Sequence, residues 1–134
     1  MVSFSKAISN CFKKSFSIKG RATRAEYWWF QLFCLLIDIV ILIPAFLFKV
    51  EDVIQVCVTL IGIRILICLI PNICLTIRRL HDVGMSAWFI LIVFIPFGGF
   101  ILLFFLLSPS AFDNQFGPNP HEHEYNTEVE EINL

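Results

Sequence analysis

Charge is scarce in this sequence of 134 residues. Charged side chains make up 16% of the chain and hydrophobic ones 57%, whereas a typical globular domain has about 25% and about 45–50%. A soluble domain of this length cannot bury that much apolar surface, because small domains leave a large share of their surface exposed. The composition therefore excludes a small soluble domain and indicates a single integral membrane domain.

Paired cysteine motifs and metal-ligand motifs are also absent from the sequence. The five cysteines are Cys11, Cys34, Cys57, Cys68 and Cys74. No two have Cys-x-x-Cys spacing, and four lie in apolar runs, where cysteine acts as a small hydrophobic side chain. We therefore expect no disulfide framework and no zinc site. His121 and His123 do not form a His-Glu-x-x-His motif, so no metal or cofactor is predicted.

Three long apolar runs hold most of the hydrophobic residues. Each reaches the roughly 20 residues that a helix needs to cross a bilayer. The runs are continuous rather than alternating, which favours helices over the strands of a membrane barrel. The sequence therefore predicts an all-α membrane protein with a three-helix transmembrane domain over residues 24–107. Its spans are expected at about 24–48, 53–77 and 87–107.

The third run has a weak point at its middle, where Pro96, Gly98 and Gly99 interrupt the apolar side chains. A kinked single span is the favoured expectation, because proline removes one helical hydrogen bond and bends the axis. The alternative is a re-entrant pair of half-helices, which would return the tail to the side from which the run began. That alternative needs protein to cover irregular backbone inside the lipid.

Residues 1–23 form a basic segment with amphipathic spacing. The apolar positions are Phe4, Ile8, Cys11, Phe12 and Phe16, and lysines fall between them. This spacing predicts an amphipathic helix in the membrane interface, with a disordered basic leader as the alternative. Thr23 and Glu26 then match a capping box, which predicts that the first span begins near Arg24.

Charge is distributed unevenly along the chain, and this asymmetry predicts the topology. Residues 1–26 hold six basic groups, whereas residues 108–134 hold six acids and neither Lys nor Arg. Because basic residues mark the cytoplasmic side, the N-terminus and the loop at 78–86 are expected inside. With three spans, the tail is expected outside. It is rich in turn-forming residues at first, then acidic, and disorder is expected at its end.

Two charges lie within the predicted spans. Asp38 and Arg64 are at similar depths when counted from the same ends of antiparallel helices. A lone charge at the bilayer centre is costly, so the two are expected to pair and to fix the register of the helices. The alternative is a proton or ion relay. Gln31 and Asn72 repeat the coincidence of depth nearer the basic end.

Residues 78–84 are the most suggestive stretch for chemistry. They combine two guanidinium groups with His81 and Asp82 at a membrane exit. Arginine forks fit phosphate oxygens, so a headgroup or phosphate site is one interpretation. A topology-setting loop is the other. Since no Ser or Cys nucleophile lies in the same stretch, an acid–base role for His81 and Asp82 is disfavoured and no catalytic residue is predicted.

Three sequence elements resemble one known family. Residues 20–30, Gly-Arg-Ala-Thr-Arg-Ala-Glu-Tyr-Trp-Trp-Phe, resemble the GRxSRxEFWWF signature of the YhaH/YhaI-like inner membrane proteins, domain of unknown function 805. Residues 78–88 are similar to that family's RRLHD-x-G-x-SGWW element, and residues 116–120 to its terminal Gly/Pro/Asn stretch. Ala87 stands where the family usually has Gly, and Gln115 where it often has a basic residue.

The resemblance implies a small multi-pass protein of the bacterial inner membrane and implies no activity. It also implies that the charged residues of the two main elements form one site at one membrane face. These residues are Arg21, Arg24, Glu26, Arg78, Arg79, His81 and Asp82. Within this site we expect Glu26 to pair with Arg78 or Arg79, and Asp82 with Arg21 or Arg24.

The predicted function is a non-enzymatic membrane module. Its basic cytoplasmic face would bind anionic lipid headgroups or a partner protein, and no nucleic acid is expected. The alternative is a subunit of an oligomeric small transporter or channel that uses Asp38 and Arg64, because three helices cannot enclose a pathway alone. A lipid-acting enzyme that uses His81 and Asp82 is the least favoured hypothesis.

Overall fold

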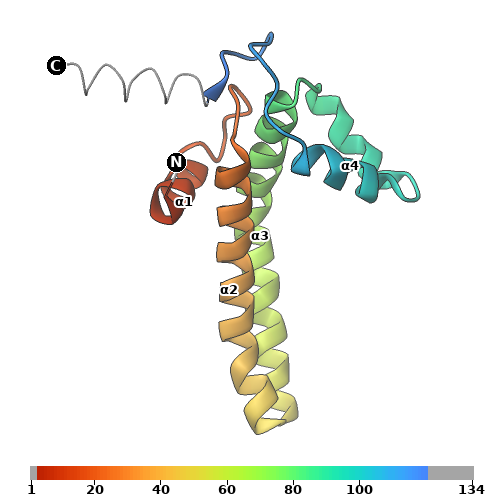
Figure 1. Cartoon of the computed structure of the whole chain (residues 1–134). Coiled ribbons are helices and arrows are strands. Elements are labelled where there is room, and N and C mark those ends of the chain that lie inside the picture. The colour runs from red at the N-terminus through yellow and green to blue at the C-terminus, as the bar shows by residue number, and fades with distance from the viewer. Residues whose placement is uncertain (1–2, 121–134) are drawn as a thin grey trace, which may run out of the picture.

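The computed structural model describes residues 3–120, which fold into helices and loops without a β-sheet (Figure 1). The helices are α1 (Phe4–Lys13), α2 (Arg24–Phe48), α3 (Glu51–Asp82), the 3₁₀ helix η1 (Ala87–Phe94) and α4 (Gly98–Leu107). The predicted all-α class is confirmed. The predicted arrangement of three transmembrane helices is not.

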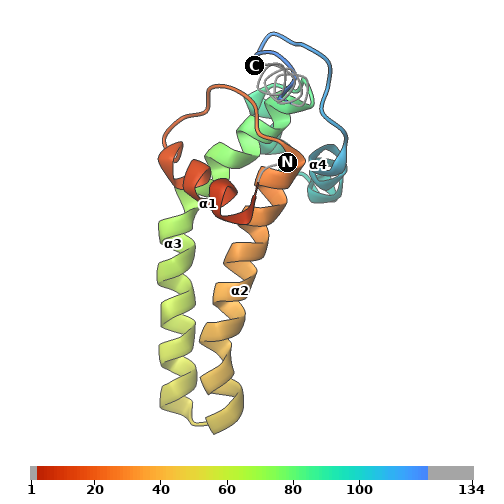
Figure 2. The ribbon, with the colours of Figure 1, turned by 60° about the vertical axis from the view of Figure 1, so that its left-hand side comes forward.

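The two long helices α2 and α3 form an antiparallel hairpin (Figures 1 and 2). Both are long and apolar enough to cross a membrane. The backbone N–H of Glu26 donates to Thr23 Oγ1 at 3.2 Å, so α2 begins at Arg24 as predicted. The 32 residues of α3 correspond to about 48 Å, well beyond the roughly 30 Å of a hydrocarbon core. Because α3 continues to Asp82, residues 78–82 form its last turn rather than the predicted loop.

The third apolar run reverses direction instead of forming one span. Phe97 takes a left-handed conformation (φ 64°) directly after Pro96, and α4 folds back against η1. The rings of Phe89 and Phe105 meet edge to face at 5.0 Å. Gly98 permits the reversal, because a Cβ atom there would lie 1.7 Å from the Ile92 carbonyl oxygen. The expectation of a kinked span is thus wrong, and the arrangement matches the alternative of two short helical segments.

Because of this reversal, the tail begins at the opposite end of the hairpin from the one predicted. The Ala111 N–H donates to the Asp82 carbonyl at 2.9 Å, so the chain after α4 returns to the end where α3 finishes and α2 begins (Figure 1). The expectation that the tail leaves from the opposite end is therefore wrong for residues 108–120. The predicted acidic, disordered end lies outside the described residues.

Helix α1 packs across α2 and α3 near the same end (Figure 2). Ala7 and Cys11 are buried on its inner face. Phe4 meets Trp29 edge to face at 5.6 Å, and Phe12 meets Phe30 at 5.8 Å. The predicted amphipathic helix is therefore present over Phe4–Lys13. The far half of the hairpin, by contrast, exposes apolar side chains over most of its surface, as a membrane-embedded segment does.

Candidate functional site

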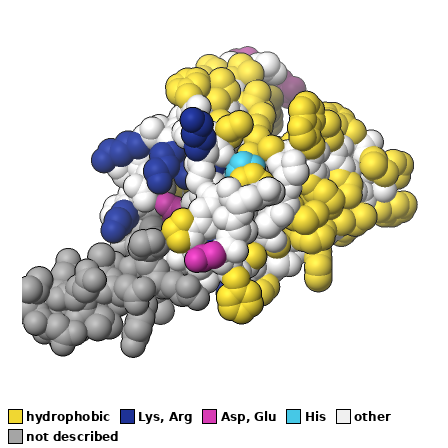
Figure 3. Space-filling model, turned by 90° about the horizontal axis from the view of Figure 1, so that it is seen from above, with side chains coloured by type: hydrophobic (Ala, Val, Ile, Leu, Met, Phe, Trp, Pro, Cys, Tyr) yellow, Lys and Arg dark blue, Asp and Glu magenta, His cyan; other side chains and the backbone are white. Residues whose placement is uncertain are grey.

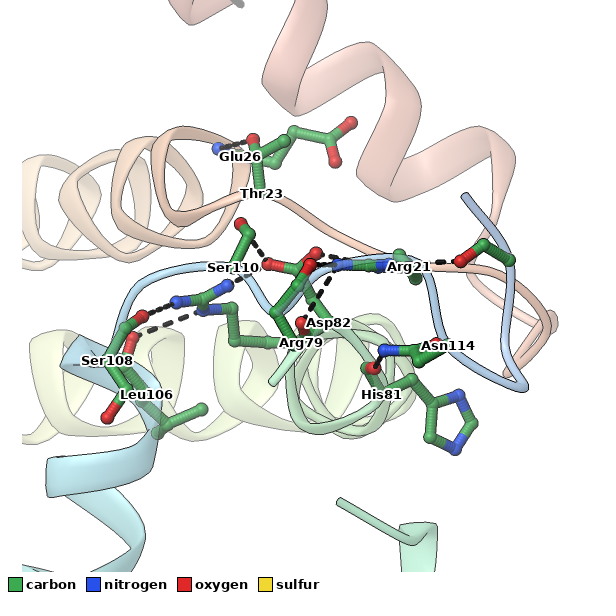
Figure 4. Close-up of polar contacts among 12 residues, drawn as sticks. Arg21, Thr23, Glu26, Arg79, His81, Asp82, Leu106, Ser108, Ser110 and Asn114 are labelled. Atoms are coloured by element: carbon green, nitrogen blue, oxygen red, sulfur yellow. Dashed lines mark hydrogen bonds and ion pairs between the residues drawn. The ribbon is translucent and has the colours of Figure 1, made fainter. Parts of the chain in front are cut away.

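A buried carboxylate, that of Asp82, organises the end of the molecule where both termini of the described chain lie. Arg21 Nε donates to Asp82 Oδ1 at 2.9 Å, and Arg79 Nη1 donates to Oδ2 (Figure 4). Ser110 Oγ donates to the same Oδ2 at 2.6 Å. The side chains of Arg21 and Asp82 are 2% and 0% exposed. We call Arg21, Arg79, Asp82 and Ser110 the Asp82 cluster.

Arg21 uses all five of its N–H donors on this chain. Besides the bond from Nε to Asp82, Nη1 donates to the carbonyls of Phe112 and Gly117 at 3.1 and 3.0 Å. Nη2 donates to the carbonyls of Asp82, at 3.1 Å, and Ala111. A guanidinium group has five donors in a fixed planar arrangement, so Arg21 has none left for a ligand. It joins the segment before α2, the end of α3 and the tail.

Arg79 joins the end of α4 to the same carboxylate. Its Nε donates to the Leu106 carbonyl at 3.2 Å, and its Nη2 donates to the Ser108 carbonyl (Figure 4). The last carbonyls of a helix have no partner within the helix, and a basic side chain is a common way to satisfy them. Arg79 thereby holds the short η1–α4 hairpin against α3.

His81 takes part in packing rather than in an acid–base pair. Its ring stacks on Phe116, with centroids 3.9 Å apart and planes at 3°. Its carbonyl accepts from Asn114 Nδ2 at 3.0 Å. Figure 4 shows the imidazole pointing away from the Asp82 carboxylate, which is occupied by the Asp82 cluster. The arrangement thus offers no hydrogen-bonded His81–Asp82 dyad.

Glu26 and Arg78 lie beneath α1 instead of pairing as predicted. Glu26 Oε1 accepts from Asn10 Nδ2 of α1 at 3.0 Å, and no ion pair joins it to Arg78 or Arg79 within residues 3–120. The Arg78 side chain is buried, and its three guanidinium nitrogens have no hydrogen-bond partner among the described residues. The predicted Glu26 pair is therefore wrong, whereas the predicted pairing of Asp82 with Arg21 is confirmed.

Cys11 shares the neighbourhood of Arg78 and Glu26. Its thiol lies 3.9 Å from the Pro71 carbonyl oxygen of α3. Burial raises the pKa of Cys11 from 9.0 to about 12, and the positive charge of Arg78 acts in the opposite direction. The Glu26 carboxylate adds a smaller effect that also raises this pKa. Glu26 and Arg78 are therefore buried near the inner face of α1. The Cys11 thiol of that face stays un-ionised near neutral pH because its pKa is raised.

The exposed charges of this end are a different set from the motif arginines. Figure 3 shows Lys and Arg side chains gathered on one side of this end of the molecule. We call the exposed basic residues of this end the basic surface: Lys6, Lys13, Lys14, Lys19 and Arg24. Of the predicted site residues, Arg24 alone belongs to it. The structure thus brings Arg21, Arg79 and Asp82 together and leaves Arg24 facing outward.

The predicted Asp38–Arg64 pair of the hairpin is confirmed, and Gln31 and Asn72, noted for their matched depth, also meet. Arg64 Nε donates to Asp38 Oδ1 at 3.0 Å, and Nη2 donates to Oδ2. Gln31 Nε2 donates to Asn72 Oδ1 at 2.9 Å. A two-point arginine–carboxylate contact constrains geometry as well as charge, so these pairs fix the register of α2 against α3. Between residues 3 and 120, no group of three or more His, Cys, Asp or Glu is placed to hold a metal ion.

Comparisons with known proteins agree with this picture of a small membrane protein. Inner membrane protein YhaI of Escherichia coli (strain K12) is 31% identical over 110 residues, which are 81% of this chain and 89% of that protein. Inner membrane protein YhaH of the same strain is 33% identical over 112 residues, 81% of this chain and 90% of YhaH. No solved structure matches. The family described as protein of unknown function (DUF805) matches residues 15–118, and the chain therefore belongs to that family of inner membrane proteins.

Proposed function

We propose that this protein is a non-enzymatic module of the bacterial inner membrane whose basic surface binds anionic lipid headgroups. In this proposal α2 and α3 span the bilayer, and the N-terminus lies in the cytoplasm. The observation that carries the proposal is the contrast between two sets of basic residues. The guanidinium groups of Arg21 and Arg79 are used inside the molecule, whereas the basic surface is exposed.

The position of the basic surface suits a membrane interface. Its lysines lie on α1 and on the segment that follows, beside the start of α2, where Trp28 and Trp29 are exposed. Indole rings favour the boundary between headgroups and acyl chains. Each basic residue near an anionic surface contributes about 1 kcal/mol of binding free energy, and the attraction fades within a Debye length. Several lysines at this depth would act together on one patch of headgroups.

The engagement of His81 and Asp82 argues against an acid–base pair formed by these two residues in the described part of the chain. The Asp82 carboxylate accepts from Arg21, Arg79 and Ser110, whereas the His81 ring, whose Nδ1 has no hydrogen-bond partner among the described residues, stacks on Phe116. An acid–base pair needs its two groups within hydrogen-bond reach of each other, and these two are apart (Figure 4). The proposal requires neither a cofactor nor a nucleic acid.

Lipid titration of charge variants tests this proposal. The purified protein in dodecyl maltoside micelles is titrated with phosphatidylglycerol, and bound lipid is counted by native mass spectrometry. Lys13→Gln should weaken binding about fivefold, the factor for about 1 kcal/mol. The combined change of Lys6, Lys13, Lys14 and Lys19 to Gln should remove most of it. Lys49→Gln, at the far end of the hairpin, is the matched control and should bind like the wild type.

Wild-type affinity in the four-lysine variant would contradict the proposal. Unchanged lipid binding together with loss of a co-purifying membrane protein would instead point to a protein partner.

An oligomeric transporter or channel subunit is the second candidate. The Arg64 and Asp38 side chains are 19% and 25% exposed on the hairpin, where a second copy could cover them. Oligomeric mass in a mild detergent tests this candidate, and a monomer would count against it.

A further inference from the structure

The Arg78 side chain differs from those of Arg21 and Arg79 in having no hydrogen-bond partner within the described part of the chain. Arg21 and Arg79 donate five and three hydrogen bonds respectively. The Arg78 side chain is just as buried, with 1% of the residue exposed, yet none of its guanidinium nitrogens has a hydrogen-bond partner within residues 3–120. A buried charge without a partner opposes folding, so its position in the fold calls for a ligand.

Helix α1 lies beside the buried Arg78 side chain. Cys11, on the inner face of α1, lies within range of the Arg78 charge and faces Pro71 of α3. The chain leading from α1 to α2 also crosses this point, since the Ala22 N–H donates to the Arg78 carbonyl at 3.1 Å. Because the Arg78 side chain is buried beside α1 and the segment that follows it, a ligand could reach the guanidinium if this part of the chain moved aside.

Glu26, an acid that acts on Cys11 as Arg78 does, is held by α1 itself. Glu26 is buried and accepts its hydrogen bond from Asn10 of α1. Docked α1 thus engages the Glu26 carboxylate, whereas the Arg78 guanidinium has no hydrogen-bond partner within the described residues. The docked arrangement satisfies Glu26 and does not satisfy Arg78.

We propose that Arg78 is a binding site for a phosphate group and that α1 is the lid over it. The proposal rests on the proposed function, because the basic surface on the outer face of α1 would bring a headgroup to this place. In the closed form α1 covers Arg78; in the open form α1 moves aside and the guanidinium binds phosphate oxygens.

The chemistry of the site selects phosphate. A guanidinium group presents parallel N–H donors that match two oxygens of a phosphate. Arg78 lies in the last turn of α3, beyond the part needed to cross a bilayer, and therefore at the depth of headgroups. A lipid headgroup and free inorganic phosphate offer the same oxygens, so the experiment separates these two sources.

The short length and amphipathic pattern of α1 are those of a helix that can leave its place on α2 and α3. Ten residues are too few for a stable isolated helix, so α1 depends on what it packs against. Its inner face is fixed by edge contacts of Phe4 and Phe12, by Cys11 and by Asn10. Its amphipathic pattern allows the same face to pack against lipid instead. The segment up to α2 turns at Gly20, where φ is 84°.

Thiol labelling of Cys11 reports the opening of α1. The wild-type protein in phosphate-free dodecyl maltoside micelles is treated with a maleimide, and modification at each cysteine is read by peptide mass spectrometry. Cys11 is buried with a raised pKa, so labelling should be slow. Phosphatidylglycerol in one arm and inorganic phosphate in the other should speed it severalfold. Acceleration in the lipid arm alone assigns the ligand to a headgroup, and acceleration in both arms shows that phosphate suffices.

Variants of Arg78 connect this response to the proposed site. Arg78→Met should abolish the acceleration of labelling in both arms. Arg78→Lys keeps the positive charge but lacks the paired N–H donors of a guanidinium group, so it should restore part of the acceleration. Lys49→Met should respond like the wild type. Cys34 and Cys68, buried between α2 and α3, should stay unlabelled throughout, because their labelling would indicate unfolding rather than lid opening.

No acceleration in either arm, or equal acceleration in Arg78→Met, would overturn the inference. The four-lysine variant separates this failure from failure of the proposed function. If that variant loses phosphatidylglycerol while Arg78→Met responds as the wild type does, the lid site is wrong and the basic surface stands. If it keeps lipid binding while phosphate still acts through Arg78, the basic surface is wrong and the lid site stands.

Discussion

Arg21 and Asp82, 61 residues apart in the sequence, meet through a 2.9 Å hydrogen bond between a guanidinium group and a carboxylate that are both buried. This contact joins the two main signature elements, which lie at the start of α2 and at the end of α3. Through the remaining donors of Arg21 it also holds the tail. Arg21 and Arg79 therefore have structural roles, and their guanidinium groups are not free to bind a ligand.

Asp82→Asn should lower the free energy of unfolding by about 3–5 kcal/mol, because it leaves two buried guanidinium groups without their counter-charge. Thermal unfolding in detergent micelles measures this loss. Asp113→Asn is the matched control at an exposed position of the same end and should change stability by less than about 0.5 kcal/mol. Equal effects of the two substitutions would contradict the assignment of Asp82 as the centre of the cluster.

The neighbouring residues Arg78 and Arg79 should differ in their response to the same substitution. Arg79→Met should destabilise the protein by about 3 kcal/mol, because Asp82 loses one of its two cations and two carbonyls lose a donor. Arg78→Met should leave stability unchanged or raise it in phosphate-free micelles, since it removes a buried charge that has no hydrogen-bond partner in the described chain. Unfolding temperatures of the two variants give the comparison. A larger loss for Arg78→Met would mean that Arg78 has a structural partner.

The sequence allowed correct prediction of contacts that depend on local pattern or on helix depth. The Thr23 cap follows from a short motif, and the Asp38–Arg64 pair follows from counting along two antiparallel helices. The adjacent residues Arg78 and Arg79 could not be separated in this way. Side chains of successive helix residues point about 100° apart, so one faces α1 and the other faces α4.

Contacts that depend on the third apolar run could not be predicted. A proline followed by glycines fits both a kink and a reversal, and the left-handed conformation of Phe97 decides for reversal. Because the tail was expected at the opposite end, Ser110 and the carbonyl groups bound by Arg21 and Arg79 were missed. Glu26 was assigned to an arginine because nothing in the sequence placed Asn10 beside it.

The intramembrane pair should show an unequal response to alanine. Asp38→Ala leaves Arg64 charged in the bilayer and should cost a few kcal/mol. Arg64→Ala should cost less, because Asp38 can take up a proton and become neutral. The combined change Asp38→Asn with Arg64→Gln should recover most of the folded yield, measured by size-exclusion chromatography. If the double variant folds no better than Asp38→Ala, the loss has a cause other than the unpaired charge.

The proposed topology places both ends of the described chain on the cytoplasmic side. Cysteine accessibility in intact spheroplasts tests this claim most directly, with a membrane-impermeant maleimide and single substitutions at three exposed positions. Glu51→Cys, at the turn of the hairpin, should be labelled at once. Ser5→Cys and Gln115→Cys should be labelled only after permeabilisation. Labelling of Gln115→Cys in intact spheroplasts would contradict the account, because it would place the tail outside and make the third apolar run a membrane span.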